Sequence, residues 1–163
     1  MNTLPRKDGG LRILVVHGPN LNLLGRREPE IYGTATLEQI NLRLRRHARA
    51  MGVRLDIFQS NHEGAIVERI QRALLDEPMA DGIVINPAGY THTSVAIRDA
   101  ITAVSLPTWE IHLTEPKNRE PFRHVSYVTD VCVGRTAGKG VDGYLEALDG
   151  LVARLRDGGK ETS

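Results

Sequence analysis

The 163-residue chain has 21 Lys and Arg against 20 Asp and Glu, so its net charge of +1 offers no electrostatic basis for binding a nucleic acid. Its 40% hydrophobic content is enough for a buried core, and its single cysteine cannot support a disulfide scaffold. The N-terminal stretch MNTLPRKDGG lacks the apolar segment of a signal peptide, and no apolar run approaches the roughly 20 residues that cross a bilayer. We expect a cytoplasmic protein that binds neither nucleic acid nor membrane.

Short β-branched runs alternate along the chain with segments of helical period, which indicates βαβ units and a parallel sheet. The runs predicted to be strands are LRILVV (11–16), VRLDIF (53–58), GIVIN (82–86), PTWEIHL (107–113) and YVTDVCV (127–133). This alternation predicts an α/β fold: a flavodoxin-like, doubly wound five-stranded parallel sheet in a three-layer α/β/α arrangement. We expect a single domain over residues 1–163, with an ordered core at about 11–156 and loose polar ends.

Each predicted helix carries an apolar stripe. The first begins after Thr36, with Gln39 completing a capping box, and the second follows Ser60, with Glu63 in the same role. The third spans about 93–104. The last helix has its apolar residues at Val141, Leu145, Leu148, Val152 and Leu155.

Four arginines on the first helix, Arg43, Arg45, Arg46 and Arg49, are a possible nucleic-acid patch. They lie on the back of an amphipathic helix with glutamate nearby and without interleaved aromatic residues, so a solvated helix face is the better interpretation.

Polar residues follow the first, third and fourth predicted strands, in HGPNLNLLGRREPEIYG, NPAGYTHTS and EIHLT. In an open parallel sheet, ligands bind beyond the carboxyl ends of the strands, near the point where the strand order reverses. Singly, these residues have ordinary explanations, such as a turn, a helix cap or a bond to a backbone carbonyl. Together they predict one cleft lined by Asn20, Arg27, Tyr32, Asn86, His92, Glu110, His112 and Thr114.

Other site classes fit the sequence poorly. The pair His62-Glu63 begins like a zinc HExxH motif, but Ile66 occupies the second histidine position. The stretch GRTAGKG (134–140) lacks the spacing and the hydroxyl of a phosphate loop, which makes it a loop leading into the last helix. Cys132 lies in an apolar stretch and is interpreted as a small buried hydrophobe. We therefore expect no metal.

A non-enzymatic rival stays open at this point: a flavodoxin-like module that binds FMN or accepts a phosphoryl group. Such a module would need a hydroxyl-rich loop after the first strand or an aspartate at the end of the third. The chain has GPNLNLLG and Asn86 at those positions.

Several stretches resemble, in order and spacing, the type II 3-dehydroquinate dehydratases of the shikimate and quinate pathways. They are HGPNLNLLGRREPEIYG, FQSNHEG, NPAGYTHTSVAIRDA, WEIHL, REPFRHVSY and GVDGYLEAL, and the resemblance runs from about residue 11 to 150. It implies a flavodoxin-like fold, a homododecamer built as four trimers, and removal of water from the substrate 3-dehydroquinate to give 3-dehydroshikimate without a cofactor.

The resemblance also implies a role for each site residue. Tyr32 would be the base that forms an enolate, and His112, oriented by Glu110, would protonate the departing hydroxyl. A free tyrosine has a pKa of about 10, so a phenol acting as a base at neutral pH needs a positive charge beside it, for which Arg27 is the candidate. Asn20 would hold a water against the enolate oxygen. The substrate would be bound by Asn86, His92, Arg123 and the backbone of Leu113 and Thr114.

Asp99 lies seven residues beyond His92, on nearly the same helix face but about 10 Å further from the strand ends, so it does not easily reach its own cleft. The family places this aspartate in the site of a neighbouring subunit. The sequence departs from the family twice: Thr114-Glu115 replaces a Ser-Asn pair, and GRTAG replaces an apolar stretch. Glu115 is expected to weaken substrate binding, with a negative charge close to the substrate carboxylate.

Overall fold

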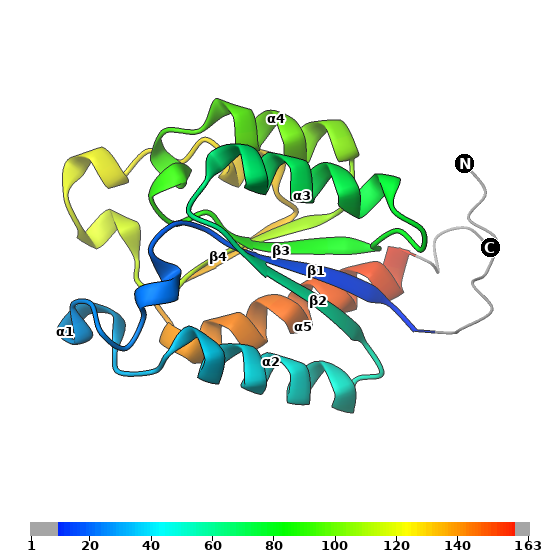
Figure 1. Cartoon of the computed structure of the whole chain (residues 1–163), viewed down its shortest axis with the longest axis horizontal. Coiled ribbons are helices and arrows are strands. Elements are labelled where there is room, and N and C mark those ends of the chain that lie inside the picture. The colour runs from blue at the N-terminus through cyan, green and yellow to red at the C-terminus, as the bar shows by residue number, and fades with distance from the viewer. Residues whose placement is uncertain (1–9, 159–163) are drawn as a thin grey trace.

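The computed structural model describes residues 10–158, which form a parallel sheet covered by helices on both faces (Figure 1). The strands are β1 (Arg12–His17), β2 (Arg54–Gln59), β3 (Gly82–Asn86), β4 (Thr108–His112) and β5 (Gly134–Ala137). The α-helices are α1 (Pro29–Tyr32), α2 (Leu37–Ala50), α3 (Glu63–Leu75), α4 (Val95–Val104) and α5 (Gly140–Gly158). Short 3-10 helices occupy Leu21–Leu23, Ala88–His92, Pro116–Asn118, Pro121–Arg123 and Thr129–Val131.

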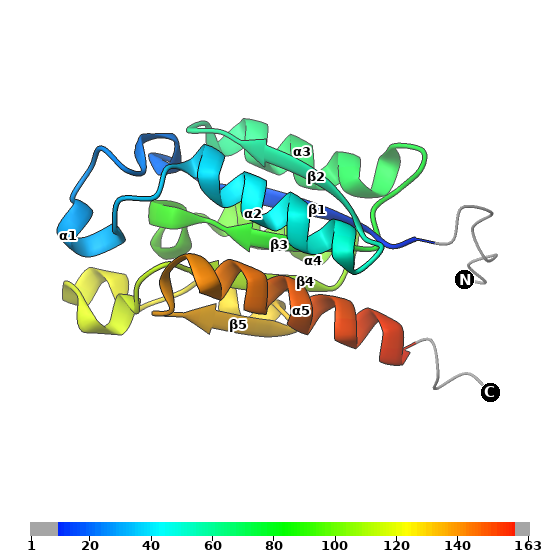
Figure 2. The ribbon, with the colours of Figure 1, turned by 90° about the horizontal axis from the view of Figure 1, so that it is seen from below.

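The sheet has the strand order β2-β1-β3-β4-β5, and all neighbouring strands are parallel. Helices α3 and α4 cover one face, and α2 and α5 cover the other (Figures 1 and 2). The predicted flavodoxin-like three-layer fold is therefore confirmed, and the order in which successive strands are added to the sheet reverses between β1 and β3. The ligand-binding cleft is therefore expected at the carboxyl ends of β1 and β3.

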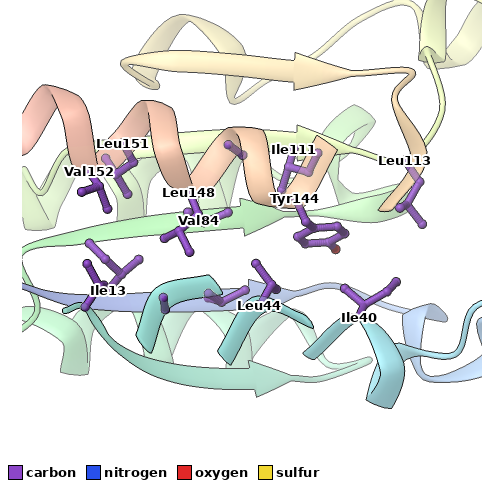
Figure 3. Packing of buried hydrophobic residues seen from close by; sticks show 14 of the residues in the cluster. Ile13, Ile40, Leu44, Val84, Ile111, Leu113, Tyr144, Leu148, Leu151 and Val152 are labelled. Carbon is purple, nitrogen blue, oxygen red and sulfur yellow. The ribbon is translucent and has the colours of Figure 1, made fainter. Parts of the chain in front are cut away.

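The core lies in two layers, one on each face of the sheet. Every residue of β3 is buried, as the central position of a parallel strand requires. On the α2 and α5 face, Figure 3 shows Tyr144 of α5 packed among aliphatic side chains of both helices and of the sheet. The Tyr144 ring is fully buried, so its hydroxyl needs a partner inside the protein.

The fifth strand differs from the prediction. The stretch 127–133 is not a strand, and β5 is formed by Gly134–Ala137, which was expected to be a loop. The Ser126 hydroxyl accepts the backbone N–H groups of Val128 and Thr129, and this local bonding replaces a strand ladder. The buried Val128 still packs on the α4 side of the core, which explains the apolar pattern of the stretch.

The helix starts are partly as predicted. The capping box of Thr36 and Gln39 is present at the start of α2. The capping box expected at Ser60 is wrong, because the Ser60 hydroxyl accepts the N–H of His62 and α3 begins only at Glu63. The third helix begins at Val95, after the cap residue Ser94. Of the ends predicted to be loose, residues 157 and 158 complete α5, while 1–9 and 159–163 lie outside the described residues.

The segments that follow β1, β3 and β4 meet at one end of the sheet. Both views place α1 and the segment at 116–123 at this end (Figures 1 and 2). The loops after β1 and β3 approach closely at Gly18, where an added Cβ would lie 2.5 Å from the Pro87 carbonyl oxygen. This contact brings the two predicted site loops together.

Candidate active site

A cavity of about 180 Å³ opens at the carboxyl ends of β1, β3 and β4. It is smaller than the roughly 300–1,000 Å³ pockets that hold drug-sized ligands, so it suits a compact molecule. Nine of the eleven predicted site residues line it: Asn20, Arg27, Tyr32, Asn86, His92, His112, Leu113, Thr114 and Arg123. The other two do not. Glu110 lies behind His112, and Asp99 is exposed on α4.

The Tyr32 phenol is held between two arginines. Arg119 Nη1 donates a hydrogen bond to the Tyr32 hydroxyl oxygen at 2.6 Å, and the guanidinium carbon of Arg27 lies 4.8 Å from the centre of the ring. Arg27 also pairs with Glu28 at 3.2 Å. The guanidinium that contacts the phenol oxygen is therefore that of Arg119, not of Arg27, which was the predicted partner.

Arg119 was assigned no role from the sequence, although it begins the REPFR motif that carried part of the resemblance. It lies 87 residues from Tyr32 along the chain, beyond the 3-10 helix at Pro116–Asn118. Its side chain is only 16% exposed, which shields its charge from water and strengthens its effect on the phenol oxygen.

His112 and Glu110 form a buried pair on β4. They lie two residues apart and so share one face of the strand, and His112 Nε2 lies 2.7 Å from Glu110 Oε1. Two hydroxyl groups also donate to Glu110, from Ser126 at 3.2 Å and from Thr129 at 2.6 Å. Among residues 10–158, the other His112 ring nitrogen, Nδ1, has no protein partner.

The Glu110 carboxyl is fully buried, yet its surroundings favour the ionised form. Burial is the largest single influence and raises the pKa, but the His112 bond and charge, the Thr129 bond and the Arg135 charge together hold the pKa below its usual value. An ionised Glu110 fixes the orientation of the His112 ring and stabilises an imidazolium there.

His92 is anchored by the chain itself. Its Nδ1 donates to the Val125 carbonyl at 2.7 Å, which is one of the ordinary contacts that the sequence left open for the polar residues at the strand ends. Burial lowers the pKa of His92, against an opposing contribution from the Val125 bond. The neutral ring then presents Nε2 as an acceptor, and this residue lines the cavity.

Asn86 is positioned by a buried hydrogen-bond chain that was not predicted. Its Oδ1 accepts the N–H of Ala88 at 3.1 Å, and its Nδ2 donates to the Tyr144 hydroxyl at 3.0 Å. That hydroxyl lies 3.0 Å from His17 Nδ1, and His17 Nε2 lies 2.8 Å from Asn41 Oδ1. Burial lowers the pKa of His17 to about 4, so the ring is neutral and Tyr144 donates to it.

The remaining predicted residues complete the wall of the cavity. Asn20 has a left-handed backbone, with φ of 67°, and its N–H donates to Asn61 Oδ1. Arg123 pairs with Glu120 at 2.7 Å. Glu115 does not line this cavity, because its carboxylate turns toward Arg135 of β5. The weakening of substrate binding expected from Glu115 stays a prediction.

Two negative findings concern the described part of the chain. No helix within residues 10–158 combines the length and apolar character needed to span a bilayer. In the same range, no group of three or more His, Cys, Asp and Glu side chains is arranged to hold a metal ion.

The family model described as "Dehydroquinase class II" matches residues 11–152. The chain belongs to the class II dehydroquinase family. A relative named 3-dehydroquinate dehydratase 1, from Ralstonia nicotianae, is 58% identical over 142 residues, which cover 87% of this chain and 90% of the relative.

Solved structures of class II dehydroquinases have the same fold. The type II dehydroquinase from Butyrivibrio crossotus superposes with a TM-score of 0.84 at 44% identity, covering 87% of this chain and 97% of that one. The enzyme from Propionibacterium acnes gives a TM-score of 0.82 at 38% identity, covering 88% and 99%. The resemblance stated from the sequence motifs is thus confirmed at the level of family and fold.

Proposed function

We propose that this chain removes water from 3-dehydroquinate to give 3-dehydroshikimate, as a type II hydro-lyase. One observation carries the proposal: the Tyr32 phenol, bonded to Arg119, and the His112 imidazole, bonded to buried Glu110, line a single small cavity. An elimination needs a base and an acid at one substrate, and these two groups supply them.

The first step is proton abstraction by Tyr32 from the carbon beside the substrate ketone, C2. The C–H bond breaks, its electron pair forms the enolate, and the proton moves to the phenolate oxygen. Arg119 stabilises negative charge on that oxygen through its 2.6 Å hydrogen bond, and Arg27 adds a second positive charge over the ring. Asn20, at the cavity wall, holds a water against the enolate oxygen.

The second step expels the C1 hydroxyl. Hydroxide is a poor leaving group, so His112 donates a proton as the C–O bond breaks, and water departs while the enolate collapses to the conjugated enone. Glu110 stabilises the protonated His112 before transfer and keeps its ring in place. Both proton transfers use groups of this chain, so we propose that the reaction needs no cofactor and no metal.

The substrate is a carboxylate with several hydroxyl groups, and the remaining wall residues match it. Arg123 and the Leu113-Thr114 segment are placed to bind the carboxylate, while Asn86 and neutral His92 offer hydrogen bonds to hydroxyls. The buried hydrogen bond from Asn86 to Tyr144 restricts the Asn86 amide, which lowers the entropy cost of binding the substrate.

We propose a homododecamer of four trimers in which Asp99 completes the site of a neighbouring subunit. Asp99 is exposed and outside its own cavity. Apolar side chains at Val95, Val125 and Tyr127 are exposed close to it, since the backbone of 125–127 is bonded to His92 and Arg98. Such a cluster supports a protein contact at this face. We further propose a cytoplasmic enzyme made of one domain.

The rival function, a binding module for FMN or a phosphoryl acceptor, is not favoured. Its requirements are unmet at the end of β3, where Asn86 is buried and bonded to Tyr144. Family membership also favours the enzyme over this rival.

The test adds 3-dehydroquinate to the purified protein and follows the ultraviolet absorbance of the enone. We expect turnover that survives EDTA and is not inactivated by borohydride, because no step uses a metal or a lysine Schiff base. Absence of enone formation by folded protein would overturn the proposal, and a yellow bound flavin would favour the rival.

A further inference from the structure

Arg135, on the edge strand β5, bridges two carboxylates. Its Nη2 lies 3.0 Å from Glu115 Oε1, and its Nε lies 3.9 Å from Glu110 Oε2. The Arg135 and Glu115 side chains are 28% and 29% exposed, whereas Glu110 is fully buried. The guanidinium therefore connects the water-exposed edge of the sheet with the buried partner of His112.

The sheet register fixes this arrangement. Glu110 and Arg135 are paired across the parallel ladder of β4 and β5, so their side chains are neighbours on one face of the sheet. His112 lies two residues beyond Glu110 and shares that face. A row of contacting side chains thus runs from Glu115 through Arg135 and Glu110 to His112.

Glu115 is also held in place by its own backbone surroundings. Its Oε1 accepts the N–H of Lys117 at the start of the 3-10 helix Pro116–Asn118, and the Arg135 bond holds the pKa of Glu115 below its usual value. The two departures from the family pattern, Thr114-Glu115 and GRTAG, therefore meet in one ion pair, although they are 20 residues apart in the chain.

We propose that Arg135 is a positioning residue that keeps Glu110 ionised and aligned with His112, and that Glu115 limits the positive charge which Arg135 places on this pair. The proposal rests on the dehydratase function only for its kinetic consequence. The effect on the ionisation of Glu110 follows from the ion pairs alone.

Several other titratable or charged groups lie near Glu110. On neighbouring segments these are His112 of β4, His92 after β3 and the Cys132 thiol. Three more line the same outer cavity as Glu110 and Arg135: Lys117, Arg123 and His124. All of them are present in every variant below, so differences between variants report on positions 115 and 135.

The expected effects of the two single variants have opposite signs. In Arg135→Gln a positive charge beside Glu110 is lost, so Glu110 takes up a proton at a higher pH and the acidic limb of kcat/KM moves to higher pH. An opposite charge within 4–6 Å lowers a carboxyl pKa by roughly one to three, and partial exposure of Arg135 argues for a limb shift of about one pH unit. In Glu115→Gln the acidic limb of kcat/KM moves to lower pH, by a smaller amount than the shift expected in Arg135→Gln.

The experiment measures the pH profile of kcat/KM for both single variants and for the double variant, whose limb should lie between theirs. Arg43→Gln is the matched control, because Arg43 pairs with Asp142 at 2.7 Å on α2 and α5, at a distance from the cavity. It should leave the limb unchanged. A purely structural role would lower activity in both single variants without opposite limb shifts, and that result would overturn the proposal.

A second measurement is independent of turnover: the thermal midpoint against pH for Glu115→Gln and for Glu115→Gln with Arg135→Gln. A carboxyl whose pKa is lowered by folding stabilises the protein above its unfolded pKa, and this contribution is lost as pH falls through the folded pKa. Removing Arg135 should lower the midpoint at pH 7, and the difference should shrink on acidification. A pH-independent difference would contradict the proposal, even if the wild type lacked dehydratase activity.

If Arg135→Gln does not fold, Arg135→Lys must keep the wild-type acidic limb of kcat/KM, and a shift as large as one pH unit would overturn the proposal.

Discussion

Replacing His17 by Gln should reduce the loss of stability that the protein undergoes between about pH 6.5 and pH 4. His17 is fully buried, and burial lowers its pKa from 6.5 to about 4 against a smaller opposing effect of the Asn41 bond. In this window the unfolded chain binds a proton at His17 and the folded chain does not. The free energy of unfolding therefore falls as pH decreases through the window.

The magnitude follows from the same two values. A difference between 6.5 and about 4 corresponds to roughly 3 kcal/mol of stability lost by pH 4. For a chain of this size each kcal/mol changes the thermal midpoint by about 2–4 °C, so the wild type should lose roughly 6–12 °C more than His17→Gln over the window.

The assay is thermal unfolding at a fixed protein concentration across this pH range. Tyr144→Phe is the matched control: it breaks the 3.0 Å contact with His17 Nδ1 and leaves buried groups unpaired, but it keeps the imidazole. This control should lower the midpoint at every pH and, because it keeps the buried imidazole, should still lose more stability on acidification than His17→Gln does. Equal slopes in wild type and His17→Gln would refute the reasoning.

Three further predictions concern the site. Arg119→Gln should lower kcat by about 100-fold or more, because the Arg119 charge favours the phenolate form of Tyr32 that accepts the proton, and the loss should exceed that in Arg27→Gln. The reverse order would show that the hydrogen bond to Tyr32 is not the dominant contact. Mixing inactive Tyr32→Phe subunits with inactive Asp99→Ala subunits should restore part of the activity, and mixed oligomers without any rescue would contradict a shared site. Burial raises the pKa of Cys132 to about 12, with smaller contributions from the Glu110 and Asp130 charges. Cys132 should therefore react with a thiol reagent at pH 8 only after unfolding. Rapid labelling of the native protein would contradict this prediction.

Much of the fold is predictable because its signals are local. β1 to β4 are short runs enriched in β-branched and other apolar residues, and the capping box of Thr36 and Gln39 is a short-range pattern. β5 escapes such reasoning because GRTA has little apolar character, while the preceding stretch is apolar for another reason. Its Val128 packs under α4 from a turn that Ser126 stabilises. A side-chain hydroxyl that satisfies nearby N–H groups is not visible in a hydrophobic pattern.

Some parts of the site could likewise be predicted from the sequence, and others could not. Residues directly at strand ends, such as Asn86 and His112, could be assigned from the topology rule alone. Contacts between distant segments could not. The Arg119 bond to Tyr32 joins residues 87 positions apart, and the Tyr144 contact with His17 joins residues 127 apart. Such pairs depend on how the loops and α5 return to the sheet.

Glu115 shows most plainly what the sequence does not predict, which is the direction of a side chain. From its position beside Thr114, a negative charge near the bound substrate was a reasonable expectation. The side chain instead turns to Arg135, because an ion pair and the N–H of Lys117 satisfy its carboxylate on that side. Which of two directions a side chain takes at a strand end depends on its tertiary partners.

The most direct test of the central claim is the turnover of 3-dehydroquinate by Tyr32→Phe, with the dissociation constant of the substrate measured by calorimetry on the same preparation. The variant keeps the ring between Arg27 and Arg119 and removes only the proton acceptor. We predict that enone formation falls to a small residue of the wild-type rate while the dissociation constant stays within a few-fold. Turnover near the wild-type value in the folded variant would show that Tyr32 is not the base, and the account of this site would be wrong.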